Sequence, residues 1–291
     1  MNLLIFDFGG TSIKYGIWTN DQIAETSSFP TPSSWDELTP QLLSIKNDFA
    51  ARYELTGAAF SFPGAVDSAG GIIHGISAID YIHHFPIVEA LEKLLELPVS
   101  MANDANCAAL AELWKGAAKD VDNSLFVVLG TGVGGVVIFD RKIHYGKHFF
   151  GGEFGVMELE PGKSFSEMGT AVNMATRYCE RLNVPKGTYS GKEVFELAKS
   201  GNQDAMEEVD TFYKYTALGL YNLQVSIDPD RIVIGGGLSA NDEVIQRLSS
   251  TVTQMLEDKN LAYIKPDIVP CVYRNDANLL GAVKQFLDTK L

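Results

Sequence analysis

The chain has 291 residues, of which 46% are hydrophobic, and a formal net charge of −14 at pH 7. That length suits two domains at roughly 150 residues each, and the negative charge disfavours sequence-independent nucleic-acid binding, which requires a basic surface to displace counterions from phosphate. No run approaches the roughly 18 apolar residues of a membrane span, and Cys107, Cys179 and Cys271 lack the spacing of a disulfide framework or a zinc site. We therefore expect a cytoplasmic protein with neither membrane nor nucleic acid as a partner.

Strands and helices are predicted to alternate in the first half of the chain. Short apolar or alternating runs predict strands, and apolar residues at steps of three and four predict helices. The strands are expected at residues 2–6, 14–19, 58–62 and 98–102. The helices are expected at residues 35–49 with Ser34 as the N-cap, 87–95, and 105–115 ending at Gly116. Residues 68–86 predict a loop.

The second half of the chain begins in the same way as the first. A strand at residues 125–129, a glycine turn and a strand at residues 136–139 repeat the pattern of residues 2–19 about 120 positions later. Further helices are expected at residues 170–182, 191–199, 203–226, 241–257 and 276–287, and strands at residues 231–234 and 267–273. Residues 141–168 form the other long loop. The repetition indicates two related α/β lobes.

Three glycine segments follow apolar runs, namely F-D-F-G-G-T at residues 6–11, L-G-T-G-V-G-G at 129–135 and I-G-G-G at 234–237. Glycine lets backbone N–H groups approach an anion closely. A dinucleotide-binding turn is disfavoured because a strand, not a helix, follows residue 135. The D-F-G triplet of residues 7–9 lacks the H-R-D motif of a protein kinase. With the carboxylate of N-D-A-N at residues 103–106, the glycine turns indicate a nucleotide-dependent phosphotransferase.

In order and spacing, these segments and G-E-F-G at residues 152–155 resemble the ROK family of sugar kinases over essentially the whole chain. The resemblance implies an α/β, two-lobed actin-like (ribonuclease H-like) ATPase fold with the active site in the cleft between the lobes. We assign the N-terminal lobe to residues 1–103 plus 276–291 and the C-terminal lobe to residues 104–275. ATP and Mg²⁺ as cofactors, a small-molecule sugar substrate and a homodimer are also implied.

The resemblance assigns roles to individual residues. Asp104 resembles the catalytic base, since a carboxylate aimed at a sugar hydroxyl can accept its proton as the γ-phosphoryl group arrives; a simple helix cap is the alternative. Asp7 would face Mg²⁺ through water. The expected nucleotide contacts are Gly9, Gly10 and Thr11 on phosphate, Gly130, Thr131 and Gly132 on phosphate, and Gly235 and Gly236 on adenosine.

The sugar site departs from the family pattern. Gly64, Asn103, Asp104 and Glu153 resemble sugar contacts. Glu167 is a candidate for the glutamate that, in relatives, closes a cysteine cluster; the alternative for both glutamates is a solvated loop carboxylate. Residues 158–169 contain no cysteine, so we expect no zinc site.

Val156 occupies the position where zinc-bearing relatives have a histidine that also contacts the sugar. The smaller apolar side chain would leave room for an aglycone or a second sugar ring. Nearby aromatic residues could stack on such a group: Tyr81, Phe149, Phe150 and Phe154. The alternative is that these aromatic residues belong to the core and that the substrate is plain glucose.

The expected reaction is transfer of the γ-phosphoryl group of ATP to a hydroxyl, the 6-hydroxyl, of a hexose or hexose glycoside such as glucose or a β-glucoside. Kinases of N-acetylmannosamine, fructose or mannose stay open as alternatives, because these sugars differ by single groups. A non-catalytic sugar sensor is disfavoured by the presence of both Asp7 and Asp104. An actin-like ATPase is disfavoured by the Asn-Asp step and the G-E-F-G loop.

Overall fold

The computed structural model describes residues 1–274 and 276–290, and the chain divides into two compact units. Unit 1 comprises Met1–Gly116, Lys147–Phe150 and the described part of Asn275–Leu291, and unit 2 comprises Ala117–Gly146 and Gly151–Arg274. Unit 1 continues past the expected boundary at residue 103 because helix α3 (Asp104–Lys115) packs along the C-terminal helix α9 (Ala277–Lys290).

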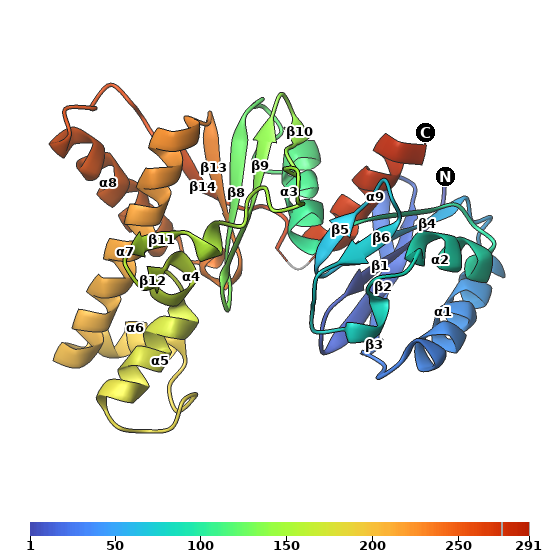
Figure 1. The fold of residues 1–291 in the computed structure, drawn as a ribbon, viewed down its shortest axis with the longest axis horizontal. Coiled ribbons are helices and arrows are strands. Elements are labelled where there is room, and N and C mark those ends of the chain that lie inside the picture. The colour runs from blue at the N-terminus through green and yellow to red at the C-terminus, as the bar shows by residue number, and fades with distance from the viewer. Residues whose placement is uncertain (275, 291) are drawn as a thin grey trace. The chain divides into compact units, whose positions relative to one another are not determined.

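A five-stranded mixed sheet forms the centre of unit 1, in the order β3-β2-β1-β4-β7 (Figure 1). Its strands are β1 (Leu3–Phe8), β2 (Ser12–Thr19), β3 (Gln22–Pro30), β4 (Gly57–Phe62) and β7 (Val99–Asn103). Strand β2 runs antiparallel to its two neighbours β1 and β3, whereas β4 and β7 run parallel to β1. The predicted strands are confirmed, but β3 was not predicted, because its sequence is mostly polar and exposed.

Helices cover both faces of this sheet (Figure 1). Helices α1 (Trp35–Ala50) and α2 (Ile87–Leu95) share a core with the even-numbered side chains of β1, including Phe6 and Phe8. Helix α9 packs on β1, β4 and β7, with α3 against it. Because side chains alternate between the two faces of a strand, the odd-numbered residues of β1 point toward α9. Ser34 caps α1 as predicted, since its side chain accepts the Glu37 N–H.

The predicted loop at residues 68–86 is partly ordered. Strands β5 (Ala65–Asp67) and β6 (Ile72–His74) form an antiparallel hairpin that begins before this segment, and Asp80–Ile82 is a short 3-10 helix. The hairpin was not predicted because each strand has only three residues, too few to show a periodic pattern.

The sheet of unit 2 repeats the sheet of unit 1, in the order β10-β9-β8-β13-β14 (Figure 1). Its strands are β8 (Ser124–Leu129), β9 (Val133–Phe139), β10 (Lys142–Ile143), β13 (Arg231–Gly235) and β14 (Ile268–Pro270). Again three strands are antiparallel neighbours and two run parallel to the first. The predicted repeat is confirmed. Strand β9 begins at Val133, earlier than predicted, and β14 is shorter than predicted.

Helices α5 (Ala171–Arg181), α6 (Gly191–Lys199), α7 (Gln203–Ile227) and α8 (Asp242–Asp258) confirm the remaining helix predictions to within two residues. Residues 141–168, predicted as a loop, contain β10, a 3-10 helix at Phe154–Val156, the strands β11 (Glu158–Glu160) and β12 (Lys163–Ser164) and the four-residue helix α4 (Phe165–Met168). No helix in the described part of the chain is both long and apolar enough to cross a membrane.

Candidate active site

Strand β1 carries Asp7 next to the first glycine turn, on the face that α9 covers. Its carboxylate oxygen Oδ1 accepts hydrogen bonds from Ser61 Oγ at 2.8 Å and from Asn278 Nδ2 at 3.0 Å. Ser61 is the register partner of Asp7 on the parallel strand β4, and Asn278 lies in the first turn of α9. Two donors from separate elements thus fix the orientation of this carboxylate.

The arrangement at Asp7 fits a magnesium ion. Its second oxygen, Oδ2, accepts no hydrogen bond from residues 1–274 and 276–290. Magnesium typically binds to one or two carboxylates, retains several waters and takes its remaining ligands from substrate phosphates. Within the described residues no group of three or more His, Cys, Asp or Glu side chains is placed to hold a metal.

The first glycine turn is closed by the end of β3. Thr31 donates its N–H to the Thr11 carbonyl at 3.1 Å and its Oγ1–H to the Gly9 carbonyl at 2.6 Å, and Gly9 donates its N–H to the Ser12 carbonyl at 3.1 Å. The turn at Gly9, Gly10 and Thr11 is therefore held from outside by a residue that the sequence analysis did not single out.

Strand β7 passes directly into α3 at Asn103 and Asp104. Asn103 is the N-cap, because its Oδ1 accepts the Asn106 N–H at 3.2 Å, and its Nδ2 donates to the Gly64 carbonyl at 2.9 Å. Asp104 is the first helical residue, and its Oδ1 accepts the Ala105 N–H at 2.8 Å. The N-cap of α3 is therefore Asn103, while Asp104 accepts an N–H of the first helical turn. The helix N-terminus stabilises negative charge at this position.

Cys107, one turn along α3 from Asp104, is fully buried. Burial, followed by the negative charges of Asp7 and Asp104, raises the pKa of the Cys107 thiol well above its usual value, and a hydrogen bond with Ser61 opposes that rise. The charges of both carboxylates thus disfavour ionisation of the same thiol and raise its pKa. The structure brings Asp7, Asp104, Ser61 and Asn103 into one region of unit 1.

The second and third glycine turns meet in unit 2. Strands β8 and β13 are parallel neighbours, with Gly235 opposite Val128. Gly236 has a φ of +84°, and a Cβ there would lie 2.3 Å from the Leu129 carbonyl oxygen, so only glycine fits. The turn at Gly130, Thr131 and Gly132 begins one residue after Leu129. The predicted phosphate and adenosine segments of this unit are therefore adjacent.

A pocket of about 960 Å³ opens beside these turns, lined by Gly130 and Gly237 and by residues of α5, α6, α7 and α8. Small-molecule sites typically measure about 300–1,000 Å³. On its wall the Arg247 guanidinium lies 3.9 Å from the centre of the Tyr213 ring and pairs with Asp210 at 2.7 Å. The contacts predicted from the sequence in this unit were Thr131 and the glycines of the two turns, and the helical walls of the pocket were not predicted.

Glu153 lies in the G-E-F-G loop, which packs against β9. The side chain is exposed, yet the protein around the carboxyl partly desolvates it and raises the pKa of Glu153. Phe154 is buried in the core of unit 2, with its ring against Gly135. The expectation that Phe154 stacks on a ligand is therefore wrong, because its ring is already packed.

Glu167 lies in α4, where it completes a capping box. Its Oε2 accepts hydrogen bonds from the backbone N–H and the Oγ of Ser164, at 2.9 and 2.8 Å, and Ser164 Oγ accepts the Glu167 N–H at 3.3 Å. These hydrogen bonds lower the pKa of Glu167. The capping box holds this carboxylate in one orientation.

Two sheets of identical strand order, each with a glycine turn after its first strand, define a two-lobed actin-like (ribonuclease H-like) ATPase fold. A model of the ROK family matches residues 4–288, and the chain belongs to that family. The predicted family and fold are confirmed.

Individual relatives agree with this assignment. A beta-glucoside kinase from Listeria monocytogenes is 34% identical, covering 99% of this chain and 98% of its own. A beta-glucoside kinase from Klebsiella pneumoniae is 32% identical over an alignment that covers 98% of this chain and 96% of that kinase. The crystal structure of a ROK family protein from Streptococcus pneumoniae in complex with sucrose is similar with a TM-score of 0.91 and 34% identity, covering 100% and 99%.

Proposed function

We propose that this protein is an ATP-dependent sugar kinase that phosphorylates the 6-hydroxyl of glucose or of a β-glucoside. The observation that carries the proposal is the placement of Asp104 at the start of α3, directly after β7, whose neighbouring strand β4 carries the Ser61 that donates a hydrogen bond to Asp7. In the reaction the sugar oxygen attacks the γ-phosphorus of ATP, its proton passes to Asp104, and ADP leaves. Positioning and charge neutralisation supply most of the catalysis, because the transferred group needs little covalent help.

Asp7 would hold Mg²⁺, directly or through water, with the oxygen that Ser61 and Asn278 leave unengaged. A magnesium ion held there would supply charge neutralisation for the phosphates of ATP. Ser61 and Asn278 keep the carboxylate from turning away when the nucleotide is absent.

The nucleotide contacts are proposed at the three glycine turns. Gly9, Gly10 and Thr11 in unit 1, and Gly130, Thr131 and Gly132 in unit 2, would donate backbone N–H groups to phosphate oxygens. Gly235 and Gly236 would meet the adenosine, whose ring has room in the adjoining pocket of about 960 Å³.

Gly64, Asn103, Glu153 and Glu167 are the proposed sugar contacts, together with Asp104. Asn103 Nδ2 uses one hydrogen for the Gly64 carbonyl and has a second to donate to a hydroxyl. A carboxylate such as Glu153 accepts hydroxyl hydrogens, and a sugar that lacked the matching hydroxyl would leave it unpaired.

The glycoside part of the proposal is supported by the names of the two relatives above and by exposed apolar side chains. Val156 is 62% exposed and Phe150 is 59% exposed. The Phe149 ring stacks on His74 with the ring centres 6.1 Å apart. Turnover of cellobiose should therefore equal or exceed turnover of glucose, and a large preference for glucose would reject an aglycone subsite. N-acetylmannosamine, fructose and mannose belong in the same substrate screen.

The decisive experiment replaces Asp104 by alanine. We expect kcat for sugar phosphorylation to fall by at least about 10²-fold, the usual contribution of a general base, with an unchanged circular dichroism spectrum. Asp48→Ala, at an exposed carboxylate on α1, is the matched control. ADP release that does not require sugar would favour an ATPase, and no ADP release with any sugar would favour a sensor. The homodimer and the cytoplasmic location stay predictions.

A further inference from the structure

Helix α4 places two neighbouring residues at two parts of the proposed site in unit 2. Ser166 Oγ accepts the backbone N–H of Val133 at 2.9 Å, directly after Gly132 in the second glycine turn. Glu167, the next residue, is the proposed sugar ligand. Any shift of α4 would therefore displace the second glycine turn and the proposed sugar-binding carboxylate of Glu167 together.

Helix α5 holds the C-terminal end of α4 through side chains. Asn173 Nδ2 donates to the Ser166 carbonyl at 2.8 Å, and Arg177 Nη1 donates to the Glu167 carbonyl at 2.8 Å. A helix of four residues has no stability of its own in water, so its position depends on such contacts. The positive charge of Arg177 also suits the last carbonyls of a helix.

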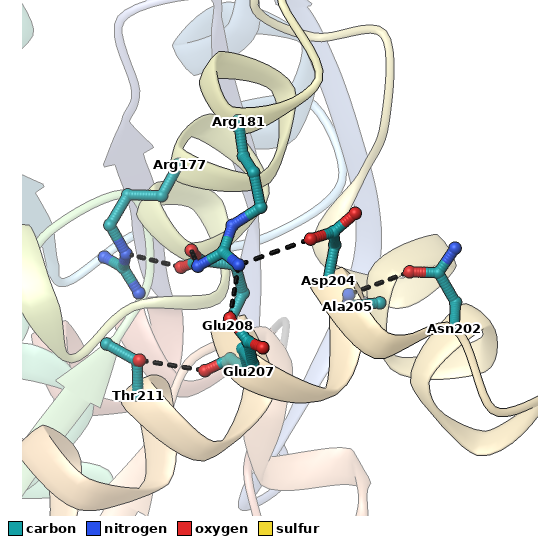
Figure 2. Close-up of polar contacts among 8 residues, drawn as sticks. All are labelled: Arg177, Arg181, Asn202, Asp204, Ala205, Glu207, Glu208 and Thr211. Carbon is teal, nitrogen blue, oxygen red and sulfur yellow. Dashed lines mark hydrogen bonds and ion pairs between the residues drawn. The ribbon is translucent and has the colours of Figure 1, made fainter.

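A buried carboxylate on α7 holds Arg177 in turn. Arg177 Nε donates to Glu208 Oε2 at 2.9 Å, and Arg181 Nη2 donates to Glu208 Oε1 at 2.9 Å. The Glu208 side chain is only 8% exposed. Figure 2 shows both arginines reaching this glutamate from one helix, with Asp204 and Glu207 beside Arg181.

We propose that Arg177 is a positioning residue for the kinase reaction. Through its pairing with Glu208, Arg177 fixes the Ser166–Glu167 segment of α4 and so couples the second glycine turn to the proposed sugar-binding carboxylate of Glu167. This inference rests on the proposed function for the roles of Gly132 and Glu167. A buried ion pair is by itself weak evidence of a contribution to stability, because desolvation offsets the attraction between the charges. The Arg177–Glu208 ion pair affects the proposed site because Arg177 also donates a hydrogen bond to the Glu167 carbonyl.

Arg181 provides a matched control within the same helix. It has the same charge, lies one turn away and shares Glu208, but its hydrogen bonds go to residues of α7 alone. If the network served only to pack α5 on α7, loss of either arginine would change stability and leave the kinetic constants alike.

The experiment compares Arg177→Met, Arg177→Lys and Arg181→Met in the full chain. We expect Arg177→Met to raise the sugar KM and lower kcat/KM by about 10- to 100-fold, the usual cost of misplaced groups near a reacting centre. Arg177→Lys should recover part of the loss. Arg181→Met should lower the urea midpoint while kcat and both KM values stay within about twofold of wild type.

Amide hydrogen exchange at Val133 gives a readout that needs no turnover. Exchange should accelerate in Arg177→Met and Arg177→Lys but not in Arg181→Met, because Arg177 donates a hydrogen bond to α4 whereas Arg181 donates its hydrogen bonds to α7. Equal exchange and equal kinetic constants in both methionine variants would overturn the inference. Absence of phosphorylation of any sugar by the wild-type protein would instead reject the proposed function, and exchange at Val133 would still decide the role of Arg177.

Discussion

Replacing Gly281 by alanine tests how closely α9 and α3 pack beneath the aspartates of unit 1. A Cβ at position 281 would lie 1.7 Å from the carbonyl oxygen of Cys107 and 2.2 Å from its carbonyl carbon. Both are backbone atoms, so no side-chain rotation can relieve the overlap. The two helices must separate, or the new methyl group cannot be accommodated.

The structure sets the expected magnitude. Non-bonded heavy atoms rest about 3.5 Å apart, so the helices must separate by roughly 1.5–2 Å. Overpacking of this kind costs about 1–3 kcal/mol and sometimes more, whereas alanine in place of glycine inside a helix contributes only about 1 kcal/mol of stability. We therefore expect a net loss of about 2 kcal/mol in the free energy of unfolding, the upper end of the difference, since the overlap is with backbone.

The same separation should lower activity. Asp104 lies one turn before Cys107 on α3, and Asn278, which donates to Asp7, lies one turn before Gly281 on α9. A misplacement of about 1 Å can cost on the order of 10² in rate, so kcat should fall by about that factor.

Urea unfolding and steady-state kinetics of Gly281→Ala measure both effects. Asp288→Ala is the control on the same helix, since it removes only a surface ion pair with Lys284 and should change neither quantity appreciably. An alanine variant that is more stable than wild type and fully active would refute the reasoning, because helix propensity would then outweigh the contact with Cys107.

Three further predictions follow from single carboxylates. Asp7→Asn should lower kcat by at least about 10²-fold, because it weakens the proposed charge neutralisation at the metal, and should weaken binding of Mn²⁺ in the presence of ADP, measured by electron paramagnetic resonance without turnover. Burial raises the pKa of Glu153 above 4.5, so this proposed sugar-binding carboxylate becomes protonated earlier on acidification than an ordinary glutamate. As the pH is lowered, the sugar KM should begin to increase before pH 4.5 is reached, and Glu153→Gln should abolish that increase. Hydrogen bonds, first from Lys163, lower the pKa of Glu160 from 4.5 to about 2. A carboxylate whose pKa is lowered by folding stabilises the fold above pH 4.5, and this stabilisation is lost as the pH falls toward 2. The urea midpoints of wild type and Glu160→Gln should therefore converge between pH 4.5 and 2.

The repeated strand, turn and strand predicted the two lobes because buried strands carry continuous apolar runs that can be recognised locally. Strand β3 escaped prediction for the opposite reason. Most residues of Gln22–Pro30 are exposed, and the strand exists because it pairs with β2 along its length. Pairing with a neighbour leaves no periodic signal in such a polar edge segment.

The predicted roles of Asp7 and Asp104 came from motif resemblance, but the groups around Asp7 did not. Ser61 lies in an apolar strand whose pairing register was not known from the sequence, and Asn278 is 271 positions away along the chain. Had the parallel pairing of β1 with β4 been assumed, Ser61 would have been found opposite Asp7. No local pattern marks Asn278, because only the packing of α9 across the sheet places it there.

Three of the four acidic residues proposed for the site lie at the beginnings of helices, where a structural and a chemical role can coincide. Asp104 is the first residue of α3, Glu153 precedes a 3-10 helix, and Glu167 is the third residue of α4. Backbone N–H groups hydrogen-bond the carboxylates of Asp104 and Glu167, whereas Glu153 makes no capping hydrogen bond with its side chain; at the first two positions a cap and a ligand share one sequence signal. Hydrogen bonds separate the two roles at Glu167, where the backbone N–H and the hydroxyl of Ser164 both donate to Oε2. When one carboxylate oxygen is held by hydrogen bonds from the fold, the direction of the other oxygen is fixed as well. The capping box of Glu167 and the two donors to Asp7 orient their carboxylates in this same way.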